Sequence, residues 1–380
     1  MKKIIIMLAA IAMVGAFTAS AMAEVSLYGS ARLWTYRVHQ DEQASKTGYS
    51  QDNTLWQLGP FSRFGAKFKS DKVSGHFEMD ARPSSDTGNQ NVDSTANKFA
   101  GSGTSWVGNM RLRILWGEWD FGAGKLGLGH NWVLTNFFLS DCQYTGDGMQ
   151  DYGSLGMVWG RTSFVELTFG DLHLALVTPD TEKGGLGTYD TRSGTNLPKF
   201  EARYNIKFDN MHFAIAGGYQ NYKIYNGTDQ DKDITSYVIG GAAWIHFGPA
   251  YVNLGLRYDQ NGGNYGMASA VTNTAQWNTA SLDVEDTHTW GATAIVGYKV
   301  NDMFKVEAYY GKTKSKNDLP GTNEDEAQAY GLTGTITLAP GVYIIPEVVV
   351  LDKMTKTVAS VETDEGKTTA FGAVWRIDFK

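Results

Sequence analysis

Residues 198–220 read PKFEARYNIKFDNMHFAIAGGYQ, and this stretch is the clearest guide to the fold. Apolar residues recur at alternate positions on both sides of Asp209-Asn210: Phe200, Ala202, Tyr204 and Ile206, then Met211, Phe213, Ile215 and Tyr219. A period of two with a short polar interruption is typical of antiparallel strands joined by a tight turn. The stretch therefore predicts a β-hairpin with one apolar and one polar face.

The same alternation recurs along the chain, in the stretches 72–82, 250–259, 303–310 and 371–379. Short turns are expected near 70–72, 120–123, 170–171, 209–210, 248–249, 301–302 and 339–341. Long polar stretches occupy 39–53, 83–105, 134–158, 180–197, 224–234, 261–286, 316–326 and 355–367. Because short turns and long stretches strictly interleave, the pattern predicts sixteen strands with all long loops at one end.

This arrangement is typical of transmembrane β-barrels, which have short periplasmic turns and longer external loops. Strands of about ten residues, tilted by about 45°, are long enough to cross the hydrocarbon core. The apolar stripes end in aromatic residues, as interfacial girdles do: Tyr204, Tyr219, Tyr258, Tyr310, Phe371 and Phe379. We expect an all-β fold, a 16-stranded antiparallel transmembrane β-barrel, wide enough for a water-filled channel. A soluble secreted β-sandwich alternates in the same way and is the alternative.

The N-terminus carries the pattern of an export signal. Met1-Lys2-Lys3 is basic, an apolar run follows, and Ala21-Met22-Ala23 fits a small-residue cleavage site. We expect residues 1–23 to be a cleaved signal peptide and residues 24–380 to form the barrel domain. No later run is long and apolar enough for a membrane helix, so the mature protein is either soluble or spans the membrane as a barrel. The strand pattern favours the barrel, and the expected location is then the bacterial outer membrane.

Composition excludes several function classes. The 380 residues include one Cys, which excludes a disulfide framework and any cysteine-built metal site. The net charge of −7 argues against a nucleic-acid partner, because nucleic-acid binders are basic. We expect no cofactor and no catalytic activity. A barrel enzyme with a His–Ser pair is a further alternative, disfavoured because such barrels are shorter than this chain.

The stretch 134–158, LTNFFLSDCQYTGDGMQDYGSLGMV, differs from the other long loops. It combines the apolar anchor Phe137-Phe138-Leu139 with three acids, Asp141, Asp147 and Asp151, and several Gly. A loop folded inside a barrel needs apolar side chains against the wall and acids toward water. The composition therefore favours a constriction loop, with an ordinary external loop as the alternative.

In architecture the mature chain resembles the trimeric general porins of Gram-negative outer membranes. The resemblance is sharpest within 107–178, where the chain reads RLRILWGEWDFGAGKLGLGHNW at 111–132 and GRTSFVELTFGDLHLALV at 160–177. The chain looks most like the homotrimeric porins of sulfate-reducing bacteria. The resemblance implies a water-filled channel for passive diffusion of small hydrophilic solutes and ions. It also implies a homotrimer in contact with outer-membrane lipid and lipopolysaccharide, inserted by the barrel-assembly machinery.

In that family the third external loop folds into the barrel, and its acids face arginines on neighbouring strands. The basic positions that match are Arg63, Arg111, Arg113 and Arg161, with Arg32 near a further one. The acids carried over are Asp141, Asp147 and Asp151. A substrate-specific porin for sugars or anions is the functional alternative.

Alternation supports part of this assignment independently. Arg63 shares a face with Lys67 and Lys69. Arg32 lies on the face of Tyr28 and Ser30. The pair Arg111 and Arg113 opposes Leu112, Ile114 and Trp116, which we therefore expect on the outer face. Arg161 shares its parity with apolar Val165 and Leu167, so it requires either a bulge or a place in the loop.

Overall fold

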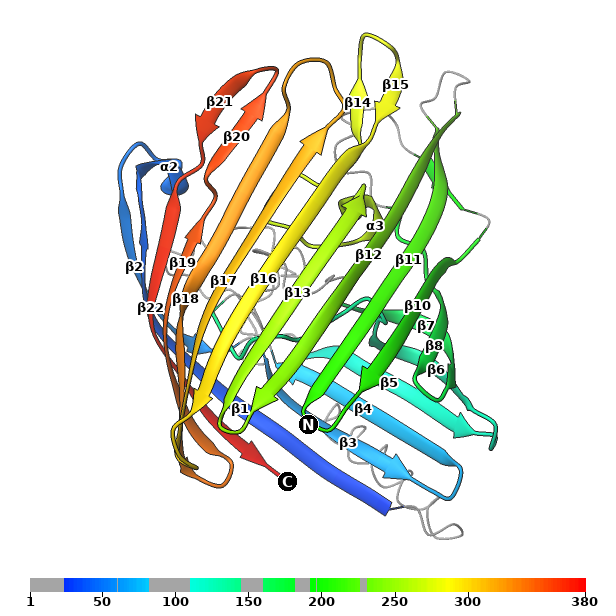
Figure 1. Ribbon diagram of the computed structural model, residues 1–380, viewed down its shortest axis with the longest axis vertical. Coiled ribbons are helices and arrows are strands. Elements are labelled where there is room, and N and C mark those ends of the chain that lie inside the picture. The colour runs from blue at the N-terminus through cyan, green and yellow to red at the C-terminus, as the bar shows by residue number, and fades with distance from the viewer. Residues whose placement is uncertain are drawn as a thin grey trace, which may run out of the picture.

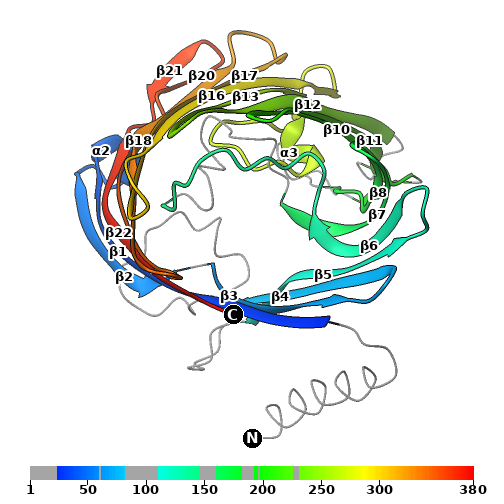
Figure 2. The same cartoon turned by 60° about the horizontal axis from the view of Figure 1, so that its bottom comes forward.

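The structure, a computed structural model, describes residues 24–59, 61–81, 110–144, 160–181, 192–195, 197–225 and 231–380. Within these ranges the chain forms a single antiparallel β-barrel around an open lumen (Figures 1 and 2). No helix in the described part of the chain is long and apolar enough to cross a membrane.

The barrel wall has sixteen strand positions, as the turn pattern predicts. The first eight positions are β1 (Glu24–Gln40), β2 (Gln51–Leu58) with β3 (Ser62–Lys69), β4 (Val73–Ala81), β5 (Met110–Asp120), β6 (Lys125–Trp132), β7 (Arg161–Phe169), β8 (Leu172–Val177), and β9 (Arg192–Gly194) with β10 (Lys199–Lys207). The other eight are β11 (Met211–Tyr225), β12 (Asp231–Phe247), β13 (Ala250–Gln260), β16 (Thr287–Lys299), β17 (Phe304–Asn317), β18 (Glu324–Ala339), β19 (Val342–Asp352) and β22 (Lys367–Phe379). Pairing of β1 with β22, from Gly29 opposite Phe379 to Gln40 opposite Thr368, closes the ring.

The second strand position is interrupted. The first half of β1 pairs with β3, and the second half pairs with β2. Between them Gly59 donates its N–H to the carbonyl of Arg32 (2.7 Å), which keeps the chain on the wall across the break. The eighth position is divided in the same manner, because β9 and β10 both pair with β11.

The outer face of the wall is apolar. Large apolar side chains exposed there include Leu27, Leu128, Leu174, Ile215, Leu256, Val296, Leu332 and Phe371. The outward orientation predicted for the six girdle aromatics is confirmed, because all six are exposed. An apolar belt of this extent is unfavourable in water and favourable in a bilayer.

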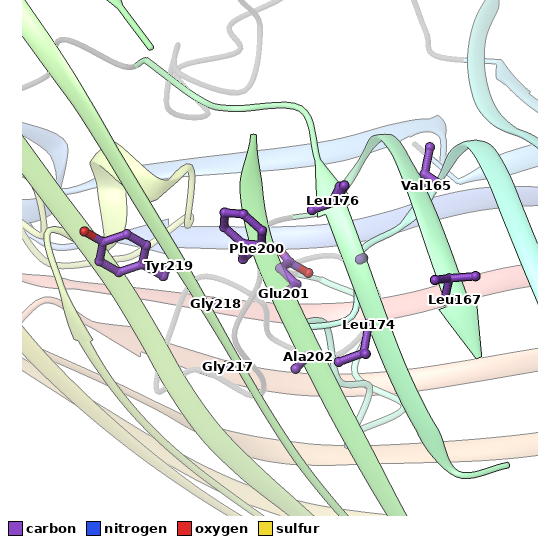
Figure 3. A pocket seen from close by; sticks show the side chains of 11 residues that line it. Val165, Leu167, Leu174, Leu176, Phe200, Glu201, Ala202, Gly217, Gly218 and Tyr219 are labelled. Carbon is purple, nitrogen blue, oxygen red and sulfur yellow. The ribbon is translucent and has the colours of Figure 1, made fainter. Parts of the chain in front are cut away.

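A shallow apolar groove runs over this outer face across β7, β8, β10 and β11 (Figure 3). Its outward side chains include Val165, Leu167, Leu174, Leu176, Phe200 and Tyr219. The groove and its apolar lining belong to this outward apolar surface.

The alternation predicted for residues 111–116 is confirmed for Leu112, which is exposed, and is wrong for Ile114 and Trp116. In the pairing of β4 with β5, Glu78 lies opposite Ile114 and Met79 opposite Leu112, so Arg113 is an extra residue in a β-bulge. Arg113 and Ile114 are both buried, whereas Leu115 is exposed on the outer face. Trp116 therefore packs on the inside against a buried apolar cluster.

The two ends of the barrel differ. The joining turns at one end are short, and that end also holds the C-terminus (Figure 1). The other end carries α2 (Glu42–Ser45), the hairpin of β14 (Gln276–Asn278) with β15 (Asp283–Glu285), and the hairpin of β20 (Thr355–Val358) with β21 (Val361–Asp364). The predicted polar stretches 261–286 and 355–367 thus contain short elements.

Candidate pore constriction

Three arginines and two acids form a compact cluster on the inner face of β3, β4 and β5. Arg111 contacts Asp80 through two bonds, Nη2 to Oδ2 at 2.7 Å and Nε to Oδ1 at 3.3 Å. Arg113 bridges both acids, with Nε 2.5 Å from Glu78 Oε1 and Nη1 3.2 Å from Asp80 Oδ2. Arg63 Nε lies 3.4 Å from Glu78 Oε2. We call these five residues the basic wall.

Exposure within the basic wall is unequal. The carboxylates lie behind, since the Asp80 side chain is 0% exposed and the Glu78 side chain 6%. Arg111 is 34% exposed and Arg63 is 27% exposed. The groups that meet water are therefore guanidiniums, which stay charged at any physiological pH. Three cations against two anions also leave a surplus of one positive charge.

Arg32 and Arg161 extend the positive region on either side. Arg32 is buried on β1 and donates from Nη1 to Gln143 Oε1 at 3.0 Å. Arg161, at the start of β7, lies with its guanidinium 4.0 Å from the ring centroid of Trp132. It is also within electrostatic range of Arg113 and Arg111. Arg32, Arg63, Arg111 and Arg113 therefore lie on the lumen side of the wall. Arg161 is the first residue of β7, not a loop residue, and it pairs with Trp132 without a register shift.

Residues 133–144, which we call the inserted segment, leave β6 and follow the inner wall instead of extending outward (Figure 2, teal trace inside the ring). The first contact is with β10. Leu134 N and Thr135 N donate to Glu201 Oε2 at 3.0 and 3.3 Å. Arg203 Nη1 donates to the carbonyl of Asn136 at 3.2 Å.

The apolar anchor then packs on β12 and β13. Trp244 Nε1 donates to the Phe138 carbonyl at 3.1 Å, and Asn253 Nδ2 donates to the Leu139 carbonyl at 2.6 Å. Leu139 fits against Gly255, where a Cβ atom would lie 2.6 Å from Leu139 Cδ1. Glycine at this position therefore allows the segment to lie directly on the wall.

The segment ends against β17, β19 and β1. Asp141 N donates to Glu307 Oε1 at 2.9 Å, and Ser140 Oγ hydrogen-bonds the same oxygen. Gln143 N and Tyr144 N donate to Glu347 at 3.1 and 3.0 Å. The Tyr144 ring packs against Tyr36 and Trp34 of β1. The segment thus passes around most of the barrel wall that lies opposite the basic wall.

Three carboxylates on the barrel strands bind the inserted segment along its path. We call Glu201, Glu307 and Glu347 the carboxylate wall. Each is buried, and each accepts main-chain N–H groups of the inserted segment. Charge-assisted hydrogen bonds of this kind are the stronger class. Burial, and then the nearby Glu347 carboxylate, raise the pKa of the Tyr144 phenol above its usual range. That phenol therefore stays neutral.

The loop acids are only partly placed. Asp141 pairs with Lys305 of β17 rather than with an arginine of the basic wall. Asp147 and Asp151 lie outside the described residues. Glu78, Asp80, Glu201 and Glu307 lie at the polar positions of the alternating stretches 72–82, 198–220 and 303–310, but nothing in the sequence shows which partner each one meets. What sequence analysis missed is the hydrogen bonding between a buried carboxylate on a strand and main-chain N–H groups far away in the chain.

The family profile described as Gram-negative porin matches residues 8–348. The chain belongs to the Gram-negative porin family. This confirms the family expected from the resemblance, and the likeness to porins of sulfate-reducing bacteria stays a prediction. A search of curated proteins found no match.

Solved structures agree with the fold of this porin. The outer-membrane channel DcaP of Acinetobacter baumannii is 16% identical with a TM-score of 0.71, over 94% of this chain and 97% of that one. The trimer form of OmpT of Vibrio cholerae is 15% identical with a TM-score of 0.59, over 94% of this chain and 99% of that one. The anion-selective porin of Comamonas acidovorans is 15% identical with a TM-score of 0.58, over 94% of this chain and 100% of that one.

The porin forms a channel for passive diffusion across the outer membrane. Both its family and its fold are those of a non-enzymatic channel. The open lumen and the arrangement of charges along it are therefore the features that decide what it conducts.

Proposed function

We propose that the basic wall and the inserted segment together form the constriction of this porin, and that the constriction favours anions. The observation that carries this proposal is the unequal exposure of opposite charges. Guanidiniums of Arg63 and Arg111 face water, whereas Asp80 and Glu78 lie behind them. On the other side, Glu307 and Glu347 are covered by the inserted segment.

The electrostatic consequence follows from the distances involved. A unit charge about 4 Å from a permeating ion in water contributes about 1 kcal/mol, and more where the walls exclude solvent. Rings of Arg and Lys are typical of anion-selective pores. The exposed acid Asp141 offsets little, because its carboxylate is already paired with Lys305. Small hydrophilic solutes with a negative charge should therefore permeate most readily.

The test is the zero-current potential of the purified porin in a planar bilayer across a KCl gradient. We expect stepwise conductance and a potential of the sign that chloride preference gives. The preference should weaken at about 1 M salt, where the screening length falls to about 3 Å. A conducting channel with cation preference would contradict the anion assignment, and a folded protein that never conducts would contradict the channel itself.

The assembly and the location of the porin complete the proposal. The Vibrio cholerae OmpT structure has a trimer form, and the apolar outer wall of this chain offers surface for a homotrimer. We propose that residues 1–23 are removed on export and that residues 24–380 form the inserted barrel domain. Outer-membrane lipid, lipopolysaccharide and the barrel-assembly machinery are its expected partners. Chemical cross-linking in outer-membrane vesicles tests the trimer, and mass spectrometry of the mature N-terminus tests the cleavage.

A further inference from the structure

Residues 261–282 are unusual among the connections at the long-loop end. They contain no Asp, Glu, Lys, Arg or His, whereas 316–326 and 355–367 both carry several charges. An exposed loop of an outer-membrane protein has no reason to avoid charge over such a length. A neutral run of small and amide side chains instead suits a segment that packs against other parts of the protein.

The first part of this run folds into the lumen, and we call residues 261–275 the mouth segment. It includes the short helix α3 (Gly262–Tyr265), which lies inside the ring of strands (Figure 2). The side chains buried within it are Asn261, Asn264, Tyr265, Met267, Val271, Asn273 and Ala275. This segment is therefore part of the packed interior.

Tyr265 fastens one end of the mouth segment to β10 and β11. Its hydroxyl donates to Glu201 Oε1 at 2.8 Å, and Lys199 Nζ donates to its carbonyl at 2.7 Å. The ring edge approaches β11 at Gly218, where a Cβ would lie 1.9 Å from the phenol oxygen. Burial, and then the Glu201 carboxylate, raise the pKa of Tyr265 well above its usual value. The phenol is thus a permanent hydrogen-bond donor.

Thr272 fastens the other end to β18 and β20. Its N–H and its hydroxyl both donate to Asp325 Oδ2 at 2.8 Å. Lys356 Nζ donates to the same hydroxyl at 2.7 Å. Between the two ends, Arg257 Nη2 donates to Ser269 Oγ at 3.2 Å. The mouth segment therefore lies across the inner face of the wall from β10 to β18.

The mouth segment and the inserted segment meet at one carboxylate. Glu201 accepts from Leu134 N, from Thr135 N and from the Tyr265 hydroxyl. Met267 also belongs to the buried apolar cluster that contains Leu139. A shared acceptor and a shared cluster place the mouth segment directly against the segment that narrows the pore.

We propose that the mouth segment is a second filter of this porin, uncharged and in series with the charged constriction, which limits solutes by size. It narrows the lumen on the side of the long loops without adding charge, because 261–282 carry none. This inference rests on the proposed channel function and adds a size limit to it. Ion preference is then set at the basic wall, and the exclusion limit is set jointly.

The main test shortens the mouth segment. Gly263 N donates to the Asn273 carbonyl at 2.9 Å, so the chain ends are close enough for two glycines to replace 267–272. We expect higher single-channel conductance and a larger size limit in liposome swelling with neutral sugars of increasing mass, with the zero-current potential unchanged. The control makes the same six-for-two replacement at 43–48, around α2, which has no buried residue.

A second variant keeps the test decisive if the shortened chain does not fold. Ala268 is exposed within the mouth segment, so Ala268→Trp adds bulk without disturbing a packed contact. We expect lower conductance and a smaller size limit, whereas Thr47→Trp on the exposed loop near α2 leaves both unchanged. Folded variants with wild-type conductance and wild-type size limit would overturn this inference while the channel itself still conducts. Failure of the wild type to conduct would instead overturn the proposed function.

Discussion

The basic wall and the carboxylate wall occupy different strands of the same barrel, yet they use their charges in opposite ways. On the basic wall, Glu78 and Asp80 lie beneath arginines, and guanidiniums meet the water. On the carboxylate wall, main-chain N–H groups of the inserted segment cover Glu307 and Glu347. One wall pairs its acids with arginines, and the other satisfies its acids with neutral donors, main-chain N–H groups and side-chain hydroxyls.

This difference separates the charge that a strand carries from the charge that a permeating ion meets. Counting residues on the polar face of each strand gives acids on both sides of the lumen. Counting exposed groups gives cations on one side and a covered wall on the other. The second count is the one that acts on a solute, because buried and paired charges are largely compensated at short range.

The largest effect, on the free energy of unfolding, is expected where the basic wall is most buried. Arg113→Met removes the guanidinium between Glu78 and Asp80 and leaves two buried carboxylates with less compensation. Breaking a buried ion pair from one side typically costs about 3–5 kcal/mol. We expect a loss of this size in the free energy of unfolding in guanidinium chloride.

Arg37→Met is the matched control for that variant, because Arg37 is an exposed arginine of β1 beside the exposed Asp52. A surface pair of this kind contributes about 0–1 kcal/mol. Equal losses for Arg113→Met and Arg37→Met would contradict the description of the basic wall as a buried network.

An intermediate effect is expected on the carboxylate wall. Glu347→Gln replaces a carboxylate that accepts from Gln143 N, Tyr144 N and the Tyr36 hydroxyl (2.8 Å). Hydrogen bonds to a charged group contribute about 1.5–3 kcal/mol each, and an amide retains part of this. We expect faster amide hydrogen exchange at Gln143 and Tyr144 by roughly tenfold, which corresponds to about 1.4 kcal/mol, with more current fluctuation.

Glu118→Gln provides the comparison, since Glu118 is bound to Lys125 (2.8 Å) near a short turn, away from the inserted segment. In the Glu118→Gln variant, amide hydrogen exchange at Gln143 and Tyr144 should match that of the wild type. If Glu347→Gln also leaves these two amides unchanged, the carboxylate wall does not hold the segment.

The smallest effect is expected at the exposed acid of the inserted segment. Asp141→Asn removes the partner of Lys305 and leaves one more cation facing the lumen. Because both side chains are partly exposed, the pair contributes about 0–1 kcal/mol. We expect a slight shift of the zero-current potential toward anion preference and no change in unfolding. A shift toward cation preference would show that Asp141 does not act as a lumen anion.

Much of the fold could be predicted from the sequence, because outward apolar residues recur at every second position. That pattern correctly predicted the sixteen strands, the short turns and the outward girdle aromatics. It failed at Ile114 and Trp116, because the bulge at Arg113 adds one residue and reverses the parity that follows. A bulge depends on how two strands pair, and one strand's sequence does not reveal it.

The candidate site was less predictable. Arg32, Arg63, Arg111 and Arg113 lie on the side of the wall that parity predicts. The roles of these four arginines and of Arg161 in the constriction stay predictions. The covering of Glu201 by Leu134, Thr135 and Tyr265 could not be predicted. Those contacts join positions more than sixty residues apart, and main-chain donors leave no mark in a sequence.

The most direct measurement compares the zero-current potentials of two mirror variants with that of the wild type, across the same KCl gradient. Arg63→Gln with Arg111→Gln removes two exposed cations, and Glu307→Gln with Glu347→Gln removes two covered anions. We expect the first variant to lose anion preference, by up to about 1 kcal/mol per arginine at low salt, and the second to stay close to the wild type. An equal and opposite shift in the second variant would show that the covered carboxylates act on permeating ions, which would contradict the account.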